Sequence, residues 1–487
     1  MKKGSKSMFF NMVSDSDMER IHEASLSLLE EMGVYSESDL ILDVFKKGGV
    51  NVDSASRVIR IPRNMVEESL KQAPSKFVLH GRIPEMDVLM EPGKVYFGMG
   101  GSPEPFIWDY RKGKKRIPSK KDMEECTRLG ESLENVDFIG AICSAGDKPQ
   151  GVQLFHEYDA LLRNTTKPLL YSAPSRYHVR KFIEMAAIAS GGEEELRKRP
   201  SIGIFTETVS PMKVAKYSDG TIDAAKMGIP VIVALAPMMG ATSPATKAGT
   251  LVQGNAEALF GVVLAQLVKP GAPVIYGPGT GTFDMSVSEY TYASPEQTAA
   301  RSVVAQLGKF YNLPTYNLGG AAESKLPDAE AGSQAMMGML MNALSGITLT
   351  KVMGTLAGGM YGSKEMLLIC DEIAGMVKQI LKGITIDDNT IGLDVIKDVG
   401  HGGNFLEHEH TAENFRNEFF FPRLFKRQNI SVWEKEGKRN ILDLANEKSE
   451  DIIRSSKPVE LPGNADKELR RALIEAEKYI SGNIKGE

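Results

Sequence analysis

The sequence predicts an α/β fold of the TIM-type (β/α) barrel class, on three observations. Eight short apolar runs alternate with helical patterns from about residue 95 onward. Together they span roughly 290 residues, a size that suits a barrel of eight parallel strands. No phosphate-binding turn follows the first run, as it often does in a doubly wound open sheet.

The predicted strands and helices alternate in a fixed order. The apolar runs lie at 95–98, 138–143, 169–171, 202–205, 231–235, 274–276, 315–317 and 348–352. Helical patterns lie near 120–134, 151–164, 178–190, 212–227, 246–268, 295–311, 328–344 and 364–382. We therefore assign residues 91–383 to the barrel.

The segments on either side of the barrel differ from it in pattern. Met18, Ile21 and Leu28 recur at helical spacing before Gly33, and further helices are predicted at 36–47 and 64–72, so residues 1–90 are expected to form a helical N-terminal extension. Residues 384–487 mix aromatic loops with charged helical stretches. We expect this C-terminal tail to pack on the barrel or to contact another subunit.

Composition narrows the class of protein. The formal net charge is −5, with both signs mixed along the chain, so neither nucleic acid nor a membrane surface is an expected partner. The three cysteines form no CxxC pair, which fits a reducing compartment. The N-terminal segment has no apolar core of signal-peptide length, and no uninterrupted apolar run reaches ~18 residues. A cytoplasmic protein is expected.

Glycine is concentrated in the segments that follow the predicted strands. In a barrel, the loops at the carboxyl ends of the strands build the active site. Six of these eight segments contain glycine, among them GPGTGTFD after the sixth strand and LGGAAESK after the seventh. Glycine here either serves tight turns or lets the backbone approach a large flat ligand. GPGTGTF lacks the Lys-Ser/Thr ending of a P-loop, so nucleotide binding is not predicted.

Aromatic residues also gather near the strand ends. A quaternary ammonium has no N–H donor, so aromatic faces and a nearby carboxylate are what can hold it. Packing at the barrel rim is the alternative role for each aromatic side chain. The candidate substrate-binding residues are Phe97, Tyr171, Phe205, Glu207, Tyr276 and Phe283, together with His401 in the tail.

The seven histidines include three near the tail. His408 and His410 stand two residues apart with His401 nearby, and imidazole suits zinc. This spacing has no cysteine partner and no HExxH motif, so we expect hydrogen-bonding residues and no metal site.

Four long segments resemble the trimethylamine methyltransferase family of methylotrophic archaea and anaerobic bacteria. They are residues 163–171, 235–277, 319–332 and 405–425, and the resemblance extends from Ile21 to about Gly437. It implies a TIM-type barrel that docks a separate small corrinoid protein and methylates the cobalt of its cobalamin. It also implies that the glycine-rich rim faces the corrin ring, with Gly279, Gly281, Gly319 and Gly320 as the candidate cofactor-binding residues.

The sequence departs from the trimethylamine-specific members at one position. Those members carry pyrrolysine in the block that corresponds to LGGAAESK, where this chain has Ala321 or a neighbour within one residue. Relatives without pyrrolysine act on quaternary amines, so the resemblance implies glycine betaine as the first candidate, with proline betaine, carnitine and γ-butyrobetaine as others. Cob(I)alamin is itself the nucleophile in such a reaction, and we assign no catalytic side chain.

Several assignments stay open at this stage. The carboxylate of a betaine needs donors, which could be His156, Arg176, His178, Lys325 or His401. One alternative function is a barrel lyase or aldolase on a phosphorylated substrate, with Lys325 or Lys351 forming a Schiff base. Another is a non-catalytic docking factor for the corrinoid protein. We expect a homo-oligomer in each case.

Overall fold

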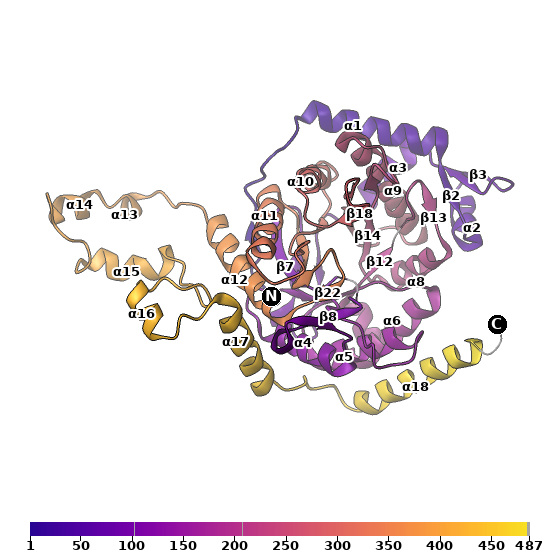
Figure 1. Ribbon diagram of the computed structural model, residues 1–487. Coiled ribbons are helices and arrows are strands. Elements are labelled where there is room, and N and C mark those ends of the chain that lie inside the picture. The colour runs from indigo at the N-terminus through magenta and orange to yellow at the C-terminus, as the bar shows by residue number, and fades with distance from the viewer. Residues whose placement is uncertain (102, 207, 485–487) are drawn as a thin grey trace.

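The computed structural model describes residues 1–101, 103–206 and 208–484. Eight parallel strands pair with one another, and they lie at the centre of the molecule, inside a layer of helices (Figure 1). Neighbouring strands pair in chain order, and the last strand pairs with the first. The strands are β7 (Lys94–Met99), β10 (Phe138–Ile139), β11 (Leu169–Tyr171), β12 (Ile202–Thr206), β14 (Val231–Leu235), β16 (Val274–Pro278), β19 (Tyr316–Leu318) and β20 (Leu349–Met353). A parallel bridge between Tyr276 and Thr315 connects β16 to the β19 segment, so the barrel is nearly closed.

A helix follows each of these strands and packs on the outside of the barrel (Figure 1). The helices are α4 (Lys120–Ser132), α5 (Gln153–Asn164), α6 (Arg176–Ser190), α8 (Gly220–Met227), α9 (Lys247–Val268), α10 (Pro295–Phe310), α11 (Ala329–Ser345) and α12 (Lys364–Leu381). The predicted TIM-type barrel is therefore confirmed, with every predicted strand within a few residues of an observed one.

Helix α9 is the most apolar of these helices. Among the described residues it is the one helix long and apolar enough to cross a membrane, but 83% of its most apolar window is buried inside the fold. The N-terminal helices α1 (Asp15–Ser27), α2 (Asp39–Lys47) and α3 (Arg63–Gln72) cover it. The rings of Phe45 and Phe260 stack between α2 and α9, with centroids 4.9 Å apart. The composition of α9 is thus that of a core helix.

The N-terminal segment is less helical than expected. Besides the three helices, it contributes β2 (Val34–Ser36), β3 (Asn51–Asp53) and β4 (Val58–Arg60) to a small sheet, and a hairpin of β5 (Phe77–Leu79) and β6 (Val88–Met90). Strands of three residues are too short to show a period in the sequence.

Alternate residues of the barrel strands point inward and form a separate apolar core. The hairpin of β5 and β6 closes the amino-terminal end of this core with Leu79, Val88 and Met90. Phe205 and Tyr316 belong to the same core at the carboxyl-terminal end. The interior of the barrel is therefore filled with side chains, and a ligand of the barrel is expected at its carboxyl-terminal mouth.

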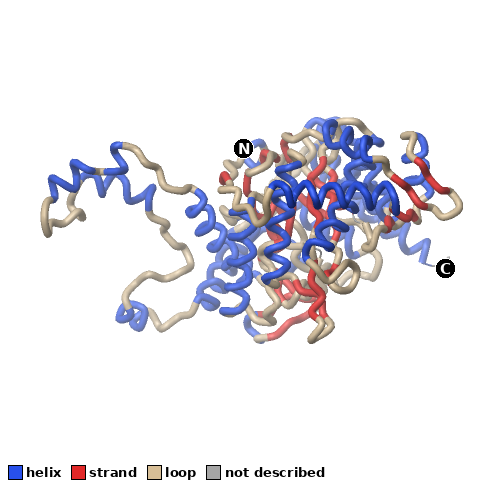
Figure 2. Tube along the Cα trace, turned by 90° about the horizontal axis from the view of Figure 1, so that it is seen from above, coloured by secondary structure: helices blue, strands red, loops and turns tan. Residues whose placement is uncertain are grey.

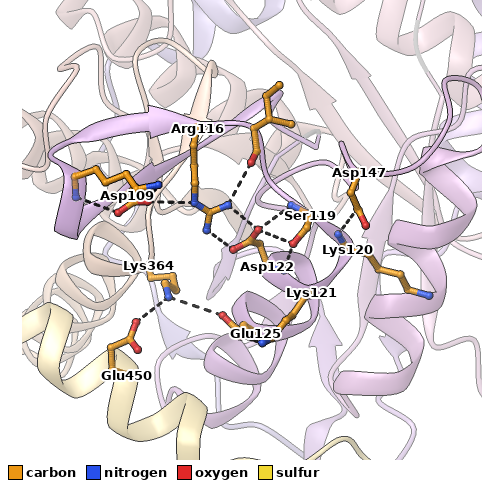
Figure 3. A network of polar contacts seen from close by, with 12 residues as sticks. Asp109, Arg116, Ser119, Lys120, Lys121, Asp122, Glu125, Asp147, Lys364 and Glu450 are labelled. Carbon is orange, nitrogen blue, oxygen red and sulfur yellow. Dashed lines mark hydrogen bonds and ion pairs between the residues drawn. The ribbon is translucent and has the colours of Figure 1, made fainter.

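A polar network fixes the hairpin that follows the first barrel strand (Figure 3). The hairpin consists of β8 (Phe106–Asp109) and β9 (Lys114–Arg116). The guanidinium of Arg116 donates to both carboxylate oxygens of Asp122 in α4, at 2.8 and 2.5 Å. Burial opposes ionisation of Asp122, but hydrogen bonds from Arg116 and Ser119 lower its pKa overall. The network holds the hairpin against the outer helices.

The C-terminal tail divides into a projecting arm and two packed helices (Figures 1 and 2). The arm carries α13 (Asp388–Ile391), α14 (Leu393–Val399), α15 (Glu409–Glu418) and α16 (Ile430–Lys435) and extends away from the barrel. Helix α17 (Ile441–Ser455) then packs on α12, where Lys364 Nζ lies 3.1 Å from Glu450, and α18 (Ala465–Ile484) packs on α6. The arm exposes large apolar side chains, including Ile384, Ile386, Leu406 and Ile430.

Candidate functional site

A cavity of about 540 Å³ opens at the carboxyl-terminal mouth of the barrel. Its size is ordinary for a small-molecule site. The ends of β12, β14, β16, β19 and β20 line it together with the loops that follow them. The lining residues with polar or aromatic side chains are Ser172, Phe205, Thr208, Ser210, Tyr217, Thr242, Thr280, Tyr290, Tyr292, Arg301, Tyr316, Asn317 and Lys351.

Two aromatic rings form the floor of this cavity. Phe205 and Tyr316 meet edge to face, with ring centroids 5.1 Å apart. The ammonium of Lys351 lies 4.4 Å from the centroid of the Phe205 ring and 2.8 Å from the carbonyl oxygen of Gly101. One face of the floor is therefore already occupied by a cation of the protein.

Arg301 of α10 forms part of the wall. Its side chain is 2% exposed, and Nη1 donates to the carbonyl oxygen of Tyr292 at 3.0 Å. Burial lowers the pKa of Arg301, while Tyr290, Tyr316 and Tyr292 act in the opposite direction. The described charged residues that line the cavity are Arg301 and Lys351, and both are cations.

Two buried carboxyl groups stand behind the lining. Glu257 accepts hydrogen bonds from Ser210 Oγ at 2.6 Å and from the Met212 amide at 2.8 Å, and so holds the loop after β12. Burial raises the pKa of Glu257. Glu104 lies beside Gly101, where burial raises its pKa to about 8 even though Thr355 donates to it at 2.8 Å. At neutral pH Glu104 is therefore mostly uncharged.

The structure brings some of the predicted aromatic residues to the cavity and not others. Phe205 lines it, whereas Phe97, Tyr171 and Tyr276 point outward from their strands into the layer between sheet and helices. The hydroxyl of Tyr171 donates to Glu157 at 2.6 Å, and that of Tyr276 donates to Asn255 at 2.7 Å. The outward-facing aromatic residues thus have packing and hydrogen-bonding roles within the barrel wall.

The other predicted substrate-binding residues are placed as follows. Phe283 lies in β17 (Gly281–Asp284) opposite Tyr290 and is not among the residues that line the cavity. His401 is exposed between α14 and α15 of the projecting arm and is not among the residues that line the cavity. Glu207 lies outside the described residues.

The proposed carboxylate donors lie elsewhere. Arg176 pairs with Asp223 at 2.6 Å, and His156 lies 2.8 Å from Glu477 of α18. His178 stacks on Phe155, with centroids 4.7 Å apart. Neither these three residues nor the exposed Lys325 is among the residues that line the cavity.

The four predicted cofactor-binding glycines share one property. Each lies where an added Cβ would meet a neighbour at 2.8 Å or less: Leu235 at Gly279, Tyr290 at Gly281, Thr350 at Gly319 and Met353 at Gly320. Of the four, Gly279 lines the cavity. Close packing between strand ends therefore requires glycine at these positions, whatever ligand approaches them.

Two important lining residues were not identified as a site from the sequence. Arg301 is a cation within the buried face of α10, and a single charge among apolar residues is the feature of the sequence that could have indicated a site. Lys351 is a charge inside an apolar strand and was considered only as a Schiff-base residue.

Comparison with known proteins relates this barrel to one family. The profile of the family described as trimethylamine methyltransferase (MTTB) matches residues 4–480. The chain belongs to the trimethylamine methyltransferase family. The family assignment that the four sequence segments implied is thus confirmed.

Members of the family with different names are about equally similar to this chain. The trimethylamine methyltransferase MttB of Desulfitobacterium hafniense (strain DSM 10664 / DCB-2) is 34% identical over 95% of this chain and 93% of its own length. The glycine betaine methyltransferase of Desulfitobacterium hafniense (strain Y51) is 33% identical over 97% of this chain and 98% of its own length. The overall sequence identity of this chain to the two relatives therefore does not distinguish between the two substrates in their names.

Solved structures of lower identity were also found. The monomethylamine methyltransferase MtmB of Methanosarcina barkeri is 13% identical, with a TM-score of 0.47 over 93% of this chain and 96% of that one. The complex of MtmB with hydroxylamine gives a TM-score of 0.46 at 14% identity, over 93% and 96% of the two chains.

Proposed function

We propose that this protein transfers a methyl group from a quaternary amine, with glycine betaine as the first candidate, to the cob(I)alamin of a small corrinoid protein. The observation that carries the proposal is the cavity at the barrel mouth, whose floor is the aromatic pair of Phe205 and Tyr316. Family membership and a similar protein named glycine betaine methyltransferase support it. The block LGGAAESK has Ala321 or a neighbour within one residue where trimethylamine-specific members carry pyrrolysine, which supports a quaternary amine over trimethylamine.

The chemistry asks little of the protein beyond binding and orientation. The reduced cobalt supplies the nucleophile, and a quaternary ammonium departs as a neutral amine that needs no proton. The residues of the cavity must hold one N-methyl group toward the mouth and keep water away, and this alignment accounts for a large part of the rate. The buried floor and the half-buried Tyr217 at the side of the cavity suit that role.

The position of the ammonium follows from the charges that surround it. Lys351 occupies one face of the Phe205 ring, and two cations on the same face repel each other. We therefore place the substrate ammonium nearer to Tyr217, Tyr316 and Met238, which line the same cavity. Aromatic faces bind the cation without the strong ground-state attraction that a paired carboxylate would add.

The corrinoid protein is proposed to approach the same end of the barrel. At Gly279 and Gly320 the backbone of the neighbouring strand leaves no room for a side chain. No side chain therefore projects from the rim of the barrel mouth at these two positions. A flat macrocycle could then lie close to the mouth. We retain the cytoplasmic location as part of the proposal, and the exposed apolar residues of the projecting arm support contact with another copy of the chain.

A panel of methyl donors tests the substrate class. Purified protein is mixed with reduced corrinoid protein and with glycine betaine, proline betaine, carnitine, γ-butyrobetaine or trimethylamine, and formation of methylcobalamin is followed by absorbance. We expect transfer from at least one quaternary amine and at most trace transfer from trimethylamine. Comparable rates with trimethylamine would contradict the proposal. Borohydride trapping of a substrate on Lys351 would instead favour an aldolase.

A further inference from the structure

Arg301 is a buried arginine that lacks an ion pair among the described residues. A guanidinium this deeply buried normally contacts a carboxylate, because removing the charge from water is costly. Here one N–H donates to the Tyr292 carbonyl, and Nε is buried with no hydrogen-bond partner. Glu323 attracts Arg301 from a distance, but its Oε1 accepts the backbone amides of Tyr292 and Ala293. The protein thus leaves part of the guanidinium unmatched.

Two further donor groups of the cavity are buried and unmatched. The hydroxyl of Thr280, just after β16, has no hydrogen-bond partner among the described residues, and neither has the amide nitrogen of Asn317 in β19. The amide oxygen of Asn317 is already used by the Leu318 amide. Thr280, Asn317 and Arg301 line the same cavity. Buried polar groups in native proteins are generally hydrogen-bonded, so three unmatched donors indicate a ligand with acceptor oxygens.

We propose that Arg301, Thr280 and Asn317 form the binding site for the carboxylate of a zwitterionic substrate. A carboxylate is planar, carries one negative charge and accepts two parallel bonds from a guanidinium. The inference rests on the proposed function and deepens it, because it selects betaines among quaternary amines. The charge of Arg301 agrees, since this guanidinium would repel an ammonium ion that carries no acid group.

Binding of matched ligand pairs to the whole protein tests the inference. Glycine betaine and γ-butyrobetaine are each compared with the corresponding amide, which keeps the trimethylammonium group and loses the negative charge. Isothermal titration should show that at least one betaine binds about tenfold or more tightly than its amide. Arg301→Met should weaken binding of that betaine by about 10- to 100-fold and binding of its amide by less than threefold. Arg176→Met is the matched control, since Arg176 pairs with Asp223 outside the cavity.

A second variant tests the inference independently, in case Arg301→Met does not fold. Thr280→Val keeps the shape of the side chain and removes the hydroxyl, so it should weaken the betaine several-fold and leave the amide unchanged. Equal loss of both ligands in the variants would overturn the inference, because Arg301 would then serve only to hold the Tyr292 loop. Equal affinity of the wild type for each betaine and its amide, or no binding of either betaine, would overturn it too.

The two proposals fail in different ways. If the protein methylates cob(I)alamin from the amides as readily as from the betaines, the proposed function stands and the carboxylate site is wrong. If the protein binds betaines selectively through Arg301 but no methylcobalamin forms, the carboxylate site stands and the proposed reaction is wrong.

Discussion

Replacing Glu104 by glutamine should change how the stability of the protein depends on pH. Burial raises the pKa of Glu104 from its usual 4.5 to about 8. The folded state therefore binds a proton more tightly than the unfolded state, and stability is lost as the pH rises from 4.5 to about 8. Each pKa unit corresponds to about 1.4 kcal/mol, so ionisation of Glu104 costs the folded state up to about 5 kcal/mol.

The glutamine side chain resembles the protonated acid and cannot ionise, so the variant does not lose stability in this way as the pH rises. Glu104→Gln should match the wild type within about 1 kcal/mol at pH 5 and exceed it by several kcal/mol at pH 9. Chemical unfolding of both proteins at pH 5, 7 and 9, followed by circular dichroism, measures the difference. Glu19→Gln on the exposed face of α1 is the control and should leave the pH dependence unchanged. Equal pH dependence in wild type and Glu104→Gln would show that Glu104 does not have a raised pKa in the folded protein.

Three further predictions concern the floor, the rim and the histidines. Phe205→Ala should weaken binding of the quaternary amine about tenfold in a titration. Phe97 is in β7 but its side chain faces the helices, so Phe97→Ala should lower the melting temperature with unchanged affinity. Gly279→Ala should destabilise the fold by about 1–3 kcal/mol in a denaturation experiment, because its Cβ would lie 2.4 Å from the Leu235 oxygen. Gly332 in α11 faces open space, so Gly332→Ala should stabilise the fold by up to about 1 kcal/mol in the same experiment, as expected for alanine in place of glycine in a helix. Removal of metal with a chelator should leave methyl transfer intact, and loss of activity restored by zinc would contradict the interpretation of His401.

The sequence contained enough information to predict the barrel. Eight apolar runs separated by helical patterns have few other solutions, and strands such as β11 and β14 begin and end at the predicted residues. Long helices were equally clear, since their spacing repeats over several turns. The short strands β2 to β6 were missed because three residues do not establish a period.

The sequence does not predict whether the side chain of each strand residue points into the barrel or toward the helices. Barrel strands are buried on both sides, so an apolar run does not reveal which residues point into the barrel. Phe205 faces the interior, but Tyr171 and Tyr276, each near the end of its own strand, face outward. The sequence-based prediction chose all aromatic residues near strand ends. The structure divides them into residues that face the barrel interior and residues that face the helices.

Arg301 shows a different limit of sequence reasoning. A single arginine in a helix gives no indication of whether a carboxylate of the protein will reach it. Only the three-dimensional arrangement shows that Arg301 is 2% exposed, lines the cavity and has an unmatched Nε. The proposed carboxylate site combines residues of α10, of the segment after β16 and of β19, which are separated in sequence and line the same cavity.

The most direct test of the proposed methyl transfer is a single-turnover reaction with a defined amount of cob(I)alamin on its carrier protein. Product analysis should find methylcobalamin and an equal amount of dimethylglycine when glycine betaine is the donor, or the corresponding demethylated amine for another betaine. Trimethylamine in the same reaction should give neither methylcobalamin nor dimethylamine above background. Dimethylamine formed in step with methylcobalamin, or no methylcobalamin from any betaine tested, would contradict the account.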